Sequence, residues 1–236
     1  MIGPRHRLSD PPFKGRTGRG VRIAVVDSGV AQNHPHVGGL VAAGISLVGV
    51  ESDTGDRIGH GTAVSAAIRE KAPNAELVPV RVFDRDLATD AATLARAIMW
   101  AAGAGCQLIN LSLGTPNFMH EALLREAVQH ANAANCLVVA AFAVDGVPQL
   151  PGALAGIQVA GVEAAREFAR DEFAVARGDG GIGILCRASI YPRPIPGVEP
   201  HRNLSGVSFA VANATAFLAL RLEDSNLATL FEEFHQ

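Results

Sequence analysis

Three polar residues stand where apolar segments meet helical ones, and their types could perform acid–base and nucleophilic chemistry. Asp27 ends the run "VRIAVVDS", His60 lies in "GHGTAV", and Ser208 lies in "SGVSFA". A carboxylate can fix the tautomer of an imidazole, which can then take the proton of a hydroxyl that attacks a carbonyl carbon. Each residue alone also fits a turn, a loop or a helix cap. Together, in the order Asp, His, Ser, they indicate a hydrolytic triad.

Apolar and helical segments alternate along most of the chain, and this alternation predicts how the three residues are positioned. The segments typical of buried parallel strands are "VRIAVVDS", "AELVPVRVF", "QLINLSL", "CLVVAA" and "GIQVAGV". The segments typical of helices are "GTAVSAAIREK", "DAATLARAIMWAAGAG", "HEALLREAVQHANAAN" and "GVSFAVANATAFLALRL". The pattern predicts an α/β fold, a mostly parallel sheet with helices on both faces. Functional groups of such sheets collect where strands end and helices begin.

The length predicts a single domain. A chain of 236 residues fits one core, because cores grow to roughly 250 residues before chains split into domains. Residues 1–20 contain Pro4, Pro11 and Pro12, which interrupt any helix, so we expect an extended N-terminal arm. Residues 21–236 then form the domain.

Composition and charge exclude several classes of protein. The formal net charge is −3 and the basic residues form no stripe, which argues against nucleic acid or an anionic membrane as partner. No run is long and apolar enough to span a bilayer, and the opening lacks the apolar core of a signal peptide, so we expect a cytoplasmic protein. The three cysteines are widely spaced and form no CxxC pair, which favours buried reduced thiols over a metal site. We expect neither metal nor cofactor, and nothing indicates an oligomeric state.

The motifs resemble those of a known family. "AVVDSGV" followed by "HP", "GHGTAV" and "GVSFA" resemble the Asp, His and Ser motifs of the subtilisin-like serine proteases, the subtilase family, and "LINLSLG" resembles its central strand. The resemblance runs from about Val21 to Leu220. It implies a three-layer subtilisin-like α/β fold and hydrolysis of peptide or protein substrates through an acyl-enzyme. By resemblance, Ser208 is the nucleophile, His60 the general base and then acid, and Asp27 the residue that orients His60.

The resemblance also implies where a peptide binds. Ser112, Leu113 and Gly114 would form a strand edge to which an extended substrate adds as another strand. Phe142 and Ala143 fall where the family has small residues lining the pocket for the side chain before the cleaved bond. We therefore predict a shallow or blocked pocket that favours small side chains.

The chain departs from the family pattern at the oxyanion site. Where the family has Ala-Ala-Gly-Asn, "VVAAFAVDG" places Val144 at the asparagine position without gaps, and a one-residue shift places Asp145 there. Valine cannot donate a hydrogen bond, and Asp145 could donate only if protonated, which requires a strongly raised pKa. An Asp145-Gly146 turn is an equal alternative. The remaining donor is the backbone N–H of Ser208 at its helix start.

Further departures shape the functional hypotheses. The Ser motif lacks its usual threonine, and Ala212 replaces the usual proline. The segment after the His motif carries few carboxylates, so we predict no calcium site there. The leading hypothesis is a serine endopeptidase, slow through loss of an oxyanion donor, with processing of one peptide precursor suggested by analogy with cyanobactin-type proteases. The alternatives are a weakened subtilase acting as a peptide-binding or scaffold module, and an esterase or amidase using the same triad.

Overall fold

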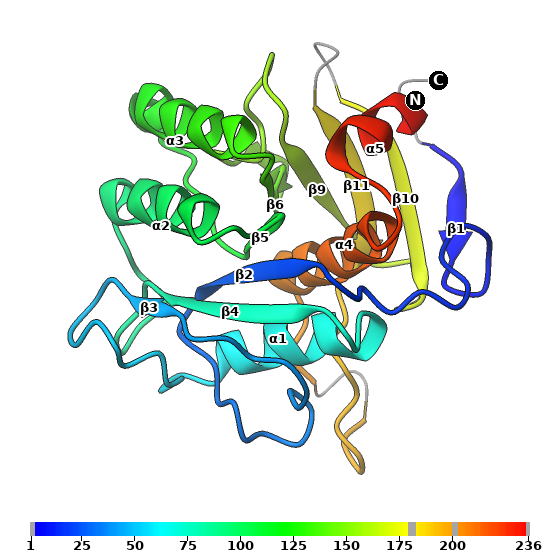
Figure 1. Cartoon of the computed structure of the whole chain (residues 1–236), viewed down its shortest axis with the longest axis horizontal. Coiled ribbons are helices and arrows are strands. Elements are labelled where there is room, and N and C mark those ends of the chain that lie inside the picture. The colour runs from blue at the N-terminus through cyan, green and yellow to red at the C-terminus, as the bar shows by residue number, and fades with distance from the viewer. Residues whose placement is uncertain (1–2, 179–182, 200–202, 235–236) are drawn as a thin grey trace.

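The strands form one large sheet and one small hairpin. The computed structural model describes residues 3–178, 183–199 and 203–234. Within them the nine-stranded sheet has the order β1-β10-β11-β9-β6-β5-β2-β4-β3, and β7 pairs with β8 in a separate hairpin (Figure 1). The strands are β1 (Arg5–Arg7), β2 (Arg22–Asp27), β3 (Ile45–Ser46), β4 (Glu76–Arg81), β5 (Leu108–Leu111), β6 (Leu137–Ala141), β7 (Ala143–Val144), β8 (Val147–Pro148), β9 (Ala160–Ala165), β10 (Glu172–Arg177) and β11 (Ile184–Ser189).

Strand direction places the chemistry at one edge of the sheet. From β11 across to β3, every neighbouring pair of strands is parallel. Only β10 and β1, at the far edge of the described sheet, run antiparallel to their neighbours. The carboxyl ends of β2, β5 and β6 therefore lie at the same edge, where crevices for ligands form in open α/β sheets.

Helices cover both faces of the sheet, and β2 shows why. Ile23 and Val25 pack in the core shared with α1 (His60–Lys71) and α4 (Val207–Leu222). Ala24 and Val26 pack in the core shared with α2 (Ala91–Gly103) and α3 (Glu121–Ala133). Alternate side chains of a strand point to opposite faces, so a strand buried on both faces is apolar throughout. The predicted three-layer α/β fold is confirmed (Figure 1). The remaining helical elements are η1 (Phe118–His120) and α5 (Leu227–Phe234).

Residues 3–20, part of the segment for which an extended arm is expected, are packed onto the rest of the chain. Strand β1 pairs antiparallel with β10. Phe13 is buried, and its ring meets Phe217 of α4 edge-on at a centroid distance of 5.1 Å. The backbone N–H groups of Thr17 and Gly18 donate to the Glu223 carboxylate after α4, at 2.5 and 2.8 Å. This segment thus holds the far end of α4.

The described part of the chain has neither a membrane-spanning helix nor a cluster of metal ligands. None of its helices is long and apolar enough to cross a membrane. Three or more acidic, histidine or cysteine side chains nowhere gather there into a cluster that could hold a metal ion. Cys106, Cys136 and Cys186 are unpaired and buried, and burial raises the pKa of each thiol.

Candidate active site

Asp27 is the last residue of β2 and is fully buried. The backbone N–H of Ser28 donates to Asp27 Oδ1 at 2.7 Å. A buried carboxylate is costly unless its oxygens accept hydrogen bonds, and here the second partner comes from α1.

His60 is the first residue of α1, and its ring reaches Asp27. Nδ1 lies 2.8 Å from Asp27 Oδ1 and 3.0 Å from Oδ2. A Cβ at Gly61 would lie 2.2 Å from the Gly29 carbonyl oxygen and 3.1 Å from Asp27 Cβ, so any side chain there would force α1 away from β2. A carboxylate acceptor at Nδ1 places the imidazole proton there and leaves Nε2 free to accept one.

The surroundings of His60 change its basicity. Burial lowers the pKa of His60, but the hydrogen bond and charge of Asp27, together with the charge of Asp56, outweigh burial and raise it above its ordinary value. Since the carboxylates favour the imidazolium form, His60 is a stronger base than a histidine in water.

We expect an NMR titration of the His60 ring to have its midpoint above 6.5, the value for an unperturbed histidine. Because the folded-state pKa is the higher one, His60 contributes stability that is complete below the unfolded pKa and is lost as pH rises through the folded pKa. A midpoint at or below 6.5 would contradict the close Asp27 contact.

Ser208 is the second residue of α4, after the exposed turn that ends at Gly206. The ring of the next residue, Phe209, lies 6.0 Å from the His60 ring between centroids, so the start of α4 stands beside His60. The Ser208 hydroxyl donates to the Ser112 carbonyl at 3.1 Å. The Ser208 hydroxyl thus faces the Ser112 carbonyl, and no hydrogen bond joins it to His60 in the described structure.

A polar chain connects β5 to the helix that carries Ser208. The Thr215 hydroxyl donates to Asn110 Oδ1 at 3.0 Å, and Asn110 Nδ2 donates to Ser112 Oγ at 2.8 Å. Ser112 Oγ in turn donates to the Ser208 carbonyl at 3.4 Å. Buried polar groups of this kind are satisfied only in one arrangement, so they fix the register of α4 on the sheet.

The predicted peptide-binding edge lies directly after β5. Ser112, Leu113 and Gly114 belong to no strand, and the backbone pairs with Leu150 only from Thr115 onward. Gly114 is exposed, whereas Ser112 is buried. Within the described residues, the segment 112–114 is thus not paired with a strand beyond β5, and it lies beside Ser208; its role in binding peptide stays a prediction.

Gln149 lies at this edge, and the sequence reading missed it because "VPQLP" has the composition of an ordinary loop. Its side chain is 7% exposed, and a Cβ at Gly114 would lie 3.1 Å from Gln149 Cβ. Its backbone N–H donates to the Phe142 carbonyl at 2.9 Å, and Nε2 donates to the Val147 carbonyl at 3.1 Å. Gln149 thus stands between the edge and the segment of Phe142 and Ala143.

Phe142 turns its ring toward β9, where a Cβ at Gly161 would meet Phe142 Cδ2 at 3.1 Å. The ring also lines a cavity of about 150 Å³ that includes Gly152 and Val159. Ala143 follows as the first residue of β7 and is half-buried. Phe142, one of the two residues predicted to line the pocket, therefore faces Gln149 with its backbone carbonyl, while its ring points toward β9.

Val144 and Asp145 lie in the β7–β8 hairpin. Asp145 and Gly146 both have positive φ, 49° and 80°, and together form the two-residue turn between the paired residues Val144 and Val147. This φ combination is typical of the turn that closes tight hairpins. Asp145 therefore has the backbone conformation of a turn residue, the alternative to an oxyanion role, and its side chain is exposed. The Ser208 N–H is among the first amides of α4, which have no acceptor within the helix.

Comparison with known proteins finds similarity to the subtilase family and to proteases. Residues 18–147 match the subtilase family. The chain is 30% identical over 218 residues to the alkaline protease of Alkalihalobacillus alcalophilus, covering 88% of this chain and 55% of that protein. It is 30% identical to subtilisin BL of Lederbergia lenta, covering 88% of this chain and 78% of that one.

Solved structures show the same fold. A cold-adapted subtilisin-like serine proteinase aligns with a TM-score of 0.69 at 23% identity, covering 92% of this chain and 81% of the other. The prenylagaramide maturation protease PagA aligns with a TM-score of 0.60 at 27% identity, covering 86% of this chain and 74% of that one.

Proposed function

Because this chain belongs to the subtilase family, we propose that it is a serine endopeptidase in which Ser208, His60 and Asp27 hydrolyse a peptide bond through an acyl-enzyme. The observation that carries the proposal is the 2.8 Å contact between His60 Nδ1 and Asp27 Oδ1, with Ser208 at the start of the adjacent helix. That contact leaves Nε2 available as the base.

The proposed reaction has two halves. In the first, Ser208 Oγ leaves the Ser112 carbonyl and attacks the peptide carbonyl carbon while His60 Nε2 takes its proton. The imidazolium, held by Asp27, then gives this proton to the leaving amine, and an ester on Ser208 remains. In the second half, His60 takes a proton from water, the hydroxide attacks the ester, and Ser208 recovers its proton from His60.

The oxyanion is stabilised by few groups in this proposal. The Ser208 N–H and the positive end of the α4 dipole supply one donor. The Val144 side chain cannot donate a hydrogen bond, and loss of one oxyanion donor costs roughly 10² to 10³ in kcat in related enzymes. The proposed enzyme is therefore slow compared with family members that keep the asparagine.

The proposed substrate is an extended peptide laid along the edge of residues 112–114, where main-chain hydrogen bonds supply affinity. Gln149, packed against Gly114, reduces the depth available to the side chain before the cleaved bond, which favours small residues there. Processing of a peptide precursor is the more specific proposal. Its support is the likeness to PagA, which is named a maturation protease.

A fluorophosphonate probe tests this function, because it reacts only with an activated serine. We expect labelling of the parent protein and none of Ser208→Ala. A module that binds peptide without hydrolysis is the second candidate, favoured by Val144 at the donor position and by the hydrogen bond that holds the Ser208 hydroxyl on Ser112. Absence of labelling in folded protein between about pH 5 and 9 would select that candidate.

A further inference from the structure

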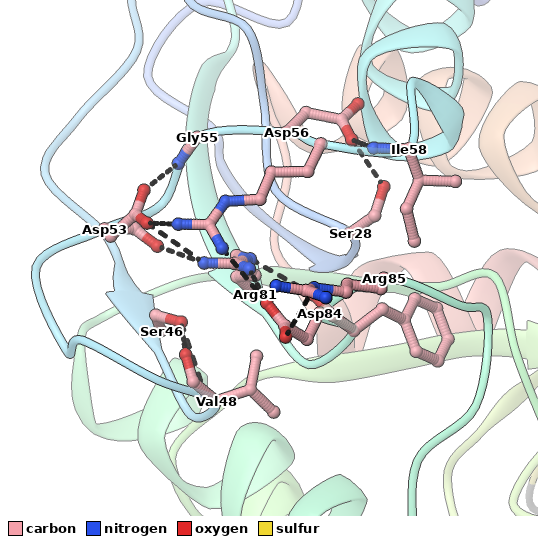
Figure 2. Close-up of polar contacts among 12 residues, drawn as sticks. Ser28, Ser46, Val48, Asp53, Gly55, Asp56, Ile58, Arg81, Asp84 and Arg85 are labelled. Carbon is pink, nitrogen blue, oxygen red and sulfur yellow. Dashed lines mark hydrogen bonds and ion pairs between the residues drawn. The ribbon is translucent and has the colours of Figure 1, made fainter.

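A second carboxylate, outside the triad, gathers an unusual number of donors. Asp56, in the loop before α1, accepts hydrogen bonds from Ser28 Oγ at 2.9 Å, from Ile58 N at 2.9 Å and from Gly59 N at 2.8 Å. It also accepts from Thr62 N at 2.9 Å and from Thr62 Oγ1 at 2.6 Å. Figure 2 shows the contacts of Asp56 with Ser28 and Ile58, apart from the contacts among Asp53, Arg81 and Asp84. Five donors on one carboxylate fix its position and that of every group it holds.

The groups held by Asp56 adjoin both members of the His60–Asp27 pair. Ser28 follows Asp27 in the chain and donates its N–H to the Asp27 carboxylate at 2.7 Å. The Ser28 hydroxyl, which donates to Asp56, accepts from the N–H of Gly61 at 2.9 Å, and Gly61 follows His60. Asp56 therefore connects the turn after β2 with the first turn of α1, which has no side-chain cap from its own N-cap residue, Gly59.

We propose that Asp56 is a positioning residue for the triad, holding Ser28 and the first turn of α1 so that His60 and Asp27 keep their contact and orientation. It touches neither substrate nor the reacting atoms, and it acts through Ser28 and Thr62. The inference rests on the proposed hydrolase function. It adds a second carboxylate whose role is separate from that of Asp27.

Charge gives Asp56 a second effect on His60. Burial raises the pKa of Asp56, but its hydrogen bonds from Thr62, Gly59 and Ile58 outweigh burial and lower it, so Asp56 is ionised at neutral pH. Asp27 from β2 and Asp56 from the loop are the anions that favour protonated His60, while Phe209 from α4 is uncharged. Asp56 also lines a cavity of about 420 Å³ together with His34, His36 and Arg193.

Two variants separate position from charge. Asp56→Asn keeps the shape but removes the charge, and we expect kcat to fall about 10- to 100-fold with KM little changed, the scale for misplacement of a catalytic group. The acid limb of the kcat profile and the NMR midpoint of His60 should both move to lower pH. Ser28→Ala keeps the charge and removes the link, so kcat should fall up to about tenfold while the His60 midpoint stays near that of the parent.

Asp53→Asn is the matched control, because it makes the same change three residues earlier. Asp53 is bound to Gly55, Arg57 and Arg81, not to Ser28 or Thr62. If Asp56→Asn matches this control in kcat and in the His60 midpoint, the inference is overturned. If Asp56→Asn does not fold, Ser28→Ala decides: parent-like kcat overturns the inference. If the fluorophosphonate probe does not label Ser208 in the parent, the proposed function is wrong. The NMR midpoints of His60 would still test the role of Asp56.

Discussion

Asp27→Asn is expected to lower kcat by about 10⁴-fold at neutral pH, the scale seen when this carboxylate is replaced in serine proteases. An amide fits the same buried space, but its NH₂ group can face His60 Nδ1 and hold that nitrogen as an acceptor. The imidazole proton then sits on Nε2, which can no longer take the proton of Ser208. Hydrolysis of a fluorogenic peptide by parent and variant measures the effect.

The same experiment needs a control for folding and charge. Asp86→Asn removes an exposed carboxylate in the loop after β4 and should leave kcat unchanged. Thermal unfolding of both variants shows whether the fold is retained. If folded Asp27→Asn keeps a rate within tenfold of the parent, His60 is not the base that Asp27 orients.

Phe217→Ala is expected to lower the free energy of unfolding by about 3 to 5 kcal/mol, since a fully buried ring leaves a cavity when removed. Phe217 lies in the middle of α4, stacked on Phe173 of β10 at 4.9 Å between centroids and met edge-on by Phe13. It therefore joins α4, the sheet and the N-terminal segment. Urea unfolding followed by circular dichroism measures the loss.

Phe118→Ala is the comparison for that loss, because Phe118 is 48% exposed. An exposed residue of the same type should change stability by no more than about 0.5 kcal/mol. A loss below about 1 kcal/mol for Phe217→Ala would show that the three rings do not pack as the structure has them.

Local patterns predicted most of the fold because its central strands and helices are locally consistent. The β2 segment is apolar on both faces, and α2 and α3 carry clear helical periodicity. Strand β10 was missed, since "AREFARDEFAVAR" resembles a solvated charged segment. Its Glu172 is buried and paired with Arg5 and Arg7 from β1. Because the residues that pair with the Glu172 carboxylate lie over 160 positions away, the local sequence gives no sign that this segment is a strand.

The site was predictable to the extent that motifs carry it. The contact of Asp27 with His60 follows from two motifs at the ends of neighbouring elements. Three features depend on loops whose paths are set by distant packing, so the motifs do not predict them. They are the hydrogen-bond partner of the Ser208 hydroxyl, the position of Gln149, and the groups that donate hydrogen bonds to Asp56. The Asp145-Gly146 turn was readable locally, but its distance from Ser208 was not. Roles of Asp145 and of residues 112–114 in catalysis stay predictions.

The contact between the N-terminal segment and the end of α4 has a consequence for the order of folding. Thr17 and Glu223 are 206 positions apart, so their contact closes almost the whole chain into a loop. The entropic cost of closing a loop grows only slowly with its length, but contacts between positions so far apart are typical of slower folding. During synthesis the β1 segment and Phe13 are made well before their partners on β10 and α4. The N-terminal segment can therefore dock only after α4, the helix that carries Ser208, has been made.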